Sequence, residues 1–171
     1  MSKSTFVVEH VSVVAEKPFE EVARALESQL GRFDPAAYAS IAESRDRERA
    51  RAVIQAMAGP SGFMLFGTID QAWLPRHILG LKQKAVQYTL GNPLFALQLT
   101  QHDVRAALYA PMRVLLYETA EGRTRLDYDR PSSIFRQFRN LEIDAFSALL
   151  DLKMEALAAA VTRAARTPAH S

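Results

Sequence analysis

The sequence contains no cysteine among its 171 residues. Disulfide bonds and thiolate chemistry are therefore excluded, and because the absence suits a reducing compartment, we expect a cytoplasmic protein. Long apolar runs are missing as well. None reaches the roughly 18 residues that a membrane-spanning helix needs, so we expect no membrane partner.

Glycine is scarce, with seven residues scattered along the chain. This leaves little material for a phosphate-binding loop, and the sequence contains no Walker loop, dinucleotide fingerprint or nucleophile elbow. The four histidines, at positions 10, 77, 102 and 170, lack the spacing of metal ligands. We therefore expect no metal site. The sequence identifies no cofactor, and haem ligation by one of these histidines has no support in it.

Positive and negative residues are nearly balanced. The chain has 21 Lys and Arg and 19 Asp and Glu, which gives a net charge of +2. Nucleic-acid binding needs basic residues that cluster on one surface. The run at positions 45–51 mixes arginines with acidic residues, so its simplest interpretation is a solvated helix face. We expect no nucleic-acid partner.

What the sequence does contain is enough apolar material for one core. Hydrophobic residues make up 49% of the chain and charged residues 23%, as is typical of soluble globular proteins. The length favours a single domain over residues 1–171. Within it we expect a helical insertion at 34–60 and a frayed tail at 167–171.

Hydrophobic periodicity predicts the α+β fold class. The segment 63–69 is almost wholly apolar and predicts a central strand covered on both faces, with Gly67 marking a bulge or a close backbone approach. We expect an antiparallel sheet of about five strands, with a long C-terminal helix across one face. The predicted strands are 6–14, 63–69, 84–90, 105–118 and 123–129, and the predicted helices begin near Pro18, Asp34, Trp73, Leu94, Ile134 and Ile143.

The last two strands predict a hairpin closed by the three-residue loop at 120–122. Aligning their apolar faces places Tyr117 opposite Arg125 and Arg113 opposite Asp129. The simpler interpretation of the polar face is cross-strand charge pairing, and the sharper one is a site for a small anionic ligand, with arginines as donors and tyrosines as walls. That face carries Tyr109, Arg113, Tyr117, Arg125, Asp127 and Asp129.

His102 lies beside a carboxylate, that of Asp103. An imidazole oriented by a carboxylate can act as a base or a metal ligand. Because adjacent residues rarely face each other, the simpler interpretation is that His102 or Asp103 caps the end of a helix or strand. Asn92, in the turn before Pro93, joins the candidate ligand-binding residues.

Several of these residues belong to short motifs that resemble the domain-of-unknown-function 302 family. The motifs are Gly91-Asn92-Pro93-Leu94, His102-Asp103, Tyr109-Ala110-Pro111, Arg113-Val114-Leu115 and Tyr128-Asp129-Arg130-Pro131-Ser132-Ser133. The resemblance implies a β-α-β4-α core similar to that of TATA-box-binding proteins, and a homodimer. Many relatives have Cys where this chain has Gly91, so a thiol role cannot be carried over, and the family name implies no activity.

Three functional hypotheses follow. The first is a non-enzymatic, homodimeric domain that binds or senses a small ligand, with apolar surface around Phe135 and Phe138 as a further reason for dimerisation. The second is an enzyme using His102 with Asp103, or the Arg113 and Arg125 face. The third is a purely structural or interaction module. The candidate ligand-binding residues are Asn92, His102, Asp103, Tyr109, Arg113, Tyr117, Arg125 and Asp127, and no catalytic residue is assigned.

Overall fold

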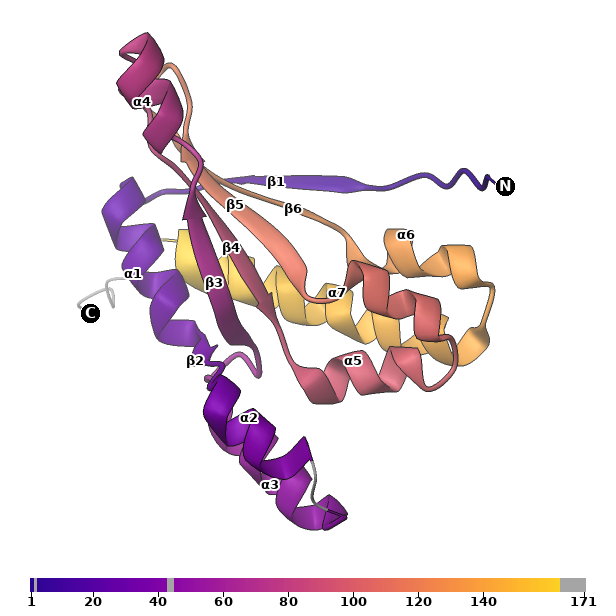
Figure 1. Ribbon diagram of the computed structural model, residues 1–171. Coiled ribbons are helices and arrows are strands. Elements are labelled where there is room, and N and C mark those ends of the chain that lie inside the picture. The colour runs from indigo at the N-terminus through magenta and orange to yellow at the C-terminus, as the bar shows by residue number, and fades with distance from the viewer. Residues whose placement is uncertain (2, 43–44, 164–171) are drawn as a thin grey trace, which may run out of the picture.

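The computed structural model describes residues 1, 3–42 and 45–163 and has an α+β architecture (Figure 1). Its six strands form one sheet in the order β1-β6-β5-β4-β3-β2. The strands are β1 (His10–Val14), β2 (Gly31–Arg32), β3 (Met64–Asp70), β4 (Ala85–Gly91), β5 (Met112–Glu118) and β6 (Thr124–Asp129). The helices are α1 (Phe19–Gln29), α2 (Pro35–Ala42), α3 (Arg47–Met57), α4 (Trp73–Leu79), α5 (Pro93–Thr100), η1 (Val104–Tyr109), α6 (Pro131–Phe135), η2 (Arg136–Phe138) and α7 (Leu141–Thr162).

The sheet is mixed, so the expectation of about five antiparallel strands was wrong. The extra strand is β2, which pairs parallel to β3, while every other pairing in the described sheet is antiparallel. Strand β2 follows directly after α1, and its Gly31 N–H donates to Phe63 O at 2.9 Å. A Cβ at Gly31 would lie 1.8 Å from Met57 O, so glycine alone lets the backbone come this close.

Helices α1 and α7 pack on one face of the sheet and form the core with it (Figure 1). The stripe predicted along the C-terminal helix is confirmed, since Ile143, Leu150, Met154 and Val161 are buried there. Ala164, the last predicted member, and the tail at 167–171 lie outside the described residues. Asn140 caps the helix by accepting hydrogen bonds from the backbone N–H groups of the next turn.

The segment 105–111 was predicted as strand and forms mainly the 3₁₀ helix η1 instead. Asp103 caps this helix by accepting a hydrogen bond from Arg105 N at 2.9 Å. Apolar residues of the segment such as Leu108 and Tyr109 are arranged around the 3₁₀ helix. They do not alternate between the two faces of a sheet. Strand β5 therefore begins only at Met112, and the prediction for 112–118 is confirmed.

Strand β3 forms as predicted, but it is not covered on both faces. Its residues from Gly67 to Asp70 are exposed, because β2 has two residues and leaves this end of β3 at the edge of the sheet. The register between β3 and β4 shifts between Leu65 and Gly67, so the strand is irregular directly beside Gly67, in line with the predicted bulge. At the other end of β3, Met64 packs against Ile41 and Ile54 of the α2 and α3 hairpin.

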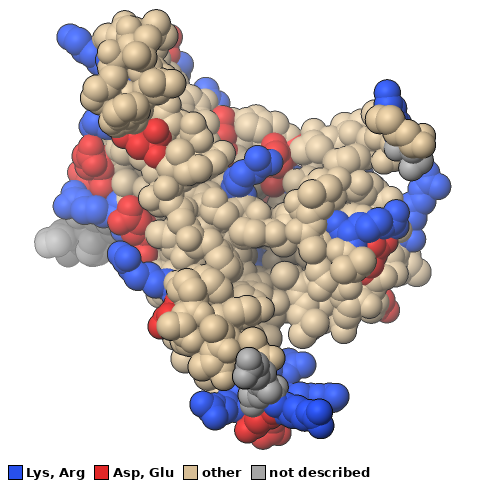
Figure 2. All heavy atoms as spheres, in the orientation of Figure 1, with Lys and Arg blue, Asp and Glu red and all other residues tan. Residues whose placement is uncertain are grey.

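Helix α4 projects from the sheet between β3 and β4 (Figure 1). None of its residues is buried, and most of its surface is uncharged (Figure 2). Lys and Arg side chains gather instead at the tip of α2 and α3, where positions 45–49 are exposed, as predicted for the mixed charge run. Within the described residues, no helix has both the length and the apolar character needed to cross a membrane.

Candidate functional site

The sheet face opposite α1 and α7, here called the open face, carries rows of side chains fixed by strand register. Ser12 of β1 pairs with Asp127 of β6, which in turn pairs with Leu115 of β5. Two positions further along the hairpin, Arg125 lies opposite Tyr117, as the three-residue loop predicted. Antiparallel strands lie about 4.8 Å apart, so side chains of one row touch their neighbours.

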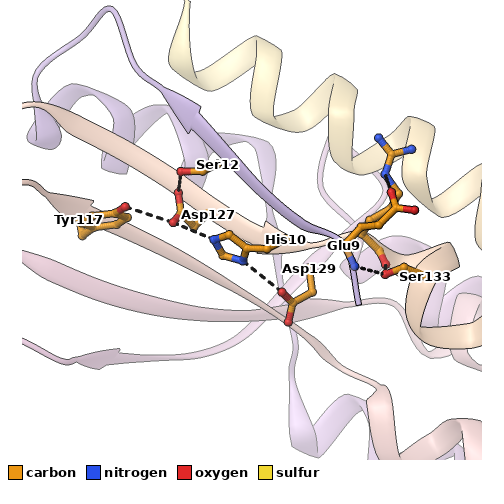
Figure 3. A network of polar contacts seen from close by, with 8 residues as sticks. Glu9, His10, Ser12, Tyr117, Asp127, Asp129 and Ser133 are labelled. Carbon is orange, nitrogen blue, oxygen red and sulfur yellow. Dashed lines mark hydrogen bonds and ion pairs between the residues drawn. The ribbon is translucent and has the colours of Figure 1, made fainter. Parts of the chain in front are cut away.

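A polar network connects β1, β6 and β5 across this face (Figure 3). His10 Nε2 lies 3.1 Å from Asp127 Oδ2, and His10 Nδ1 lies 3.2 Å from Asp129 Oδ1. Tyr117 donates its hydroxyl to Asp127 Oδ2 at 3.2 Å, and Ser12 donates to the other oxygen of the same carboxylate. Asp127 is therefore the centre of the network, with three side chains around it.

The two carboxylates raise the pKa of His10. The larger cause is the hydrogen bond to Asp129, followed by the one to Asp127, and both favour the protonated imidazole. Because 60% of the His10 side chain is exposed, solvent screens these interactions. The two carboxylates that His10 contacts lie more than 100 residues away along the chain, so the sequence did not indicate them.

The two arginines of the open face differ in their contacts. Arg125 donates through Nε to Ser12 Oγ at 3.0 Å. Continuing the hairpin register by one residue from Val114 and Tyr128 places Arg113 opposite Asp129. In the part of the chain that the structure describes, however, no ion pair reaches Arg113. The Arg113 side chain is exposed.

Among the described residues, no hydrogen bond joins the side chains of His102 and Asp103. The carboxylate of Asp103 binds the Arg105 guanidinium at 2.5 Å, which is the largest cause of a lowered Asp103 pKa. It also caps η1, so the capping interpretation is confirmed for Asp103. His102 is exposed, and no described side chain hydrogen-bonds to its imidazole.

Tyr109 and Asn92 lie away from the network. The expectation that Tyr109 shares the strand face was wrong, because the residue belongs to η1, packs against Phe135 and Phe138, and donates its hydroxyl to Gln137 Oε1 at 3.3 Å. Asn92 caps α5. Its Oδ1 accepts from the next turn and its Nδ2 donates to a backbone carbonyl, each at 2.8 Å.

Sequence reasoning missed an ion cluster that holds the N-terminal segment. Arg130 lies 3.1 Å from carboxylate oxygens of Glu9 and of Glu155, and 3.7 Å from Asp151. Ser133 Oγ accepts from Glu9 N at 3.0 Å (Figure 3). These contacts join three distant segments, and they explain how the N-terminal strand reaches the edge of the sheet.

An apolar cavity of about 190 Å³ lies where β3 and β4 meet α5 and α7. Asn92 supplies a polar side chain to its wall, and both ends of that amide are already hydrogen-bonded. Of the described residues that line it, none has a titratable side chain. The lining comprises Phe63, Phe66, Gly91, Asn92, Pro93, Phe95, Ala96, Leu99, Ala110, Pro111, Met112, Phe135 and Leu150.

The sequence held no signal for this cavity, because its aromatic and aliphatic residues look like ordinary core. Gly91 lies at the wall, where an added Cβ would be 3.3 Å from Pro111 Cβ.

The described residues contain no group of three or more His, Cys, Asp or Glu arranged to hold a metal ion.

Comparison with known proteins extends the motif resemblance to most of the chain. The family model described as "Domain of unknown function DUF302" matches residues 40–163. The crystal structure of an uncharacterized conserved DUF302 protein from Bacillus stearothermophilus is similar, with a TM-score of 0.62 and 13% sequence identity, covering 89% of this chain and 97% of that one. At that identity the similarity shows a shared fold. No curated protein matches the sequence.

Proposed function

This chain belongs to the DUF302 family, and because the family has no assigned activity, we propose from its geometry that it is a non-enzymatic domain that binds a small apolar molecule. The observation that carries the proposal is the cavity of about 190 Å³ beside α5. The cavity is partly open to solvent and its lining is almost wholly apolar, as is typical of sites for small apolar ligands. A binding role explains why the packing leaves it open.

The size and chemistry of the cavity define the ligand class. Dry apolar cavities of about 150 Å³ take up benzene or xenon. The present cavity is slightly larger and is lined by Phe63, Phe95 and Leu99, which suits one aromatic ring or a short branched hydrocarbon. Larger cofactors need about 300 Å³ or more. Asn92 is the one polar side chain among the described lining residues, and its amide already makes two hydrogen bonds to the backbone, so the site suits an apolar ligand.

The same geometry favours binding over catalysis. An enzyme using His102 needs a titratable group that converges on the imidazole, and the carboxylate of Asp103 is engaged by Arg105 instead. The cavity itself is lined by residues without acid or base function. A purely structural module would need no cavity. The binding hypothesis is therefore the one with a physical site behind it.

The proposal is tested by NMR titration of the protein with benzene and with indole. We expect saturable shifts at the amides of Phe95 and Leu99. Ala96→Leu fills the cavity from α5 and should weaken binding about tenfold or more. Ala39→Leu, the same change on an exposed position of α2, is the matched control and should bind like the wild type.

Two results would overturn the proposal: no saturable binding of either probe, or equal affinity in Ala96→Leu and the wild type. Native mass spectrometry of protein purified from its own host then identifies a retained ligand. A co-purified molecule with more than one ring would not fit the cavity.

Homodimerisation, which the family resemblance implies, is also part of the proposal. The structure removes one reason for it, because Phe135 is 1% exposed and packs inside the subunit. Exposed apolar side chains of α4 and its flanks give a different reason, since contiguous patches of this kind mark interaction surfaces. They are Ile69, Trp73, Leu74, Ile78, Leu79 and Leu81. The similarity of the core to that of TATA-box-binding proteins also remains a proposal. We do not extend it to nucleic-acid binding.

A further inference from the structure

A groove of about 360 Å³ lies at the end of the open face, separate from the apolar cavity. Strands β4 and β5 form its floor, and α6 borders one side. The segment Ala110–Met112 separates the groove from the cavity, because the same residues line both. The groove is lined by Thr89, Leu108, Tyr109, Ala110, Pro111, Met112, Arg113, Asp129 and Ile134.

Two opposite charges border this groove without neutralising each other. Arg113 forms no ion pair within residues 1, 3–42 and 45–163. The Asp129 side chain is 46% exposed, and its Oδ1 contacts His10 Nδ1 at 3.2 Å while no described residue hydrogen-bonds to its Oδ2. Strand register places the two residues opposite each other, yet their charged groups stay apart. A ligand with two charges can occupy the space between them.

Most of the other side chains that line the groove are apolar. Leu108 is 80% exposed on one wall of the groove. Met112 and Ile134 are half-buried beside it. Covering Leu108 with a hydrocarbon group would remove apolar surface from water, at about 25 cal/mol per Å². The groove therefore offers one cationic end, one anionic end and an apolar wall.

We propose that this groove binds a zwitterionic amino acid with an apolar side chain. The Arg113 guanidinium holds the carboxylate, because its planar fork can donate two parallel hydrogen bonds to the two oxygens. Asp129 accepts from the ammonium group. The hydrocarbon side chain lies along Leu108 and Ile134. This site is independent of the apolar cavity, whose lining includes neither charged residue.

The charge requirement is tested with three probes of one hydrocarbon shape: L-leucine, 4-methylpentanoate, which lacks the amine, and 3-methylbutylamine, which lacks the carboxylate. Affinities are measured by isothermal titration calorimetry, and the site is located by NMR shifts at Thr89, Arg113 and Asp129. We expect the affinity for leucine to be higher than that for either single-charge probe by about tenfold or more. Each charged hydrogen bond contributes about that factor to the affinity.

Two variants assign the charges. Arg113→Gln should weaken leucine and 4-methylpentanoate by about tenfold or more. Asp129→Asn should reduce the affinity for leucine to that for 4-methylpentanoate, while carboxylate binding survives. Arg125→Gln removes the other arginine of the open face, which lies outside the groove lining, and serves as the matched control. His10→Gln removes the His10 contact to Asp129 while leaving the carboxylate in place.

Equal affinity for the three probes would overturn the proposal. So would a loss of leucine affinity in Arg125→Gln as large as the loss in Arg113→Gln. Shifts confined to the apolar cavity would overturn it as well. Benzene binding, measured on the same variants, reports on the cavity alone. Failure of the amino-acid site and failure of the cavity proposal are therefore distinguishable.

Discussion

His10 and Asp129 lie opposite each other on β1 and β6, although they are 119 positions apart in the sequence. The imidazole bridges this carboxylate and that of Asp127 on the same strand, through its two ring nitrogens. A single side chain therefore ties the N-terminal edge strand to the hairpin on the open face. The bridge has consequences for how stability depends on pH.

We expect His10→Gln to cost stability below neutral pH and little above it. The folded-state pKa of His10 is raised by Asp129 and Asp127, so the bridge stabilises the fold fully below the unfolded pKa of about 6.5 and loses its effect as pH rises through the folded value. The exposed ring limits the difference to less than about 1 kcal/mol. Urea unfolding at pH 5.5 and pH 9 measures it, and an equal deficit at both values would contradict the bridge.

Val161→Asp should unfold the protein or lower its melting temperature strongly. Val161 is fully buried on α7, and an isolated carboxylate there loses its hydration without gaining a partner, at a cost of about 4 kcal/mol or more. Leu152→Asp on the same helix is the control, because Leu152 is 63% exposed. Thermal unfolding followed by circular dichroism should separate the two variants. Similar melting temperatures would mean that α7 does not pack as described.

Leu150→Ala should enlarge the apolar cavity and destabilise the fold. Leu150 is buried on α7 and lines the cavity, and truncating such a leucine costs about 2–5 kcal/mol. The enlarged space should accept indole more tightly than the wild type does. Thermal shift with and without indole measures both effects. A destabilised variant whose indole affinity is unchanged would show that the ligand binds elsewhere.

Arg113→Ala and Asp129→Ala should act almost additively on stability, because no ion pair joins the two side chains. Sites without a direct interaction usually add within about 0.3–0.5 kcal/mol. The cycle of His10→Ala with Asp129→Ala, measured at pH 5.5, is the comparison and should show the larger coupling, because a contact of 3.2 Å joins that pair. A larger coupling for Arg113 would show that it closes on Asp129 in solution.

Light scattering at micromolar concentration should give twice the chain mass. If the apolar surface of α4 forms the contact, the double variant Leu74→Ser and Ile78→Ser should be monomeric. Its stability should change by about 0.5 kcal/mol or less, since neither side chain is buried. A monomeric wild type would refute dimerisation, and a dimeric double variant would place the contact elsewhere.

Local patterns in the sequence were sufficient for several elements. Strand alternation and the three-residue loop predicted the hairpin register, which the pairing of Tyr117 with Arg125 confirms. The spacing of Ile143, Leu150 and Val161 predicted the buried stripe of α7. These features depend on residues within one or two turns or on one short loop, so the sequence contains all the relevant information.

Other elements depended on context that no local pattern carries. The apolar residues of 105–111 predicted a strand. Those of 63–69 predicted a strand covered on both faces. In the structure the Asp103 cap turns the first segment into η1, and the short β2 leaves the end of β3 exposed. Apolar composition shows that a segment packs, but what it packs against depends on distant parts of the chain.

The sequence alone determined the α+β fold class and, for β5 and β6, which side chains share a face, because side-chain direction follows from alternation. Which side chains meet on that face was decided by the tertiary structure. Pairing of β1 with β6 brings His10 to Asp127 and Asp129, and the ends of β3, β4 and α5 leave the apolar cavity between them. The physical reason is that neighbours across a sheet, and the voids between elements, depend on strand order and helix packing, which a local periodicity does not encode.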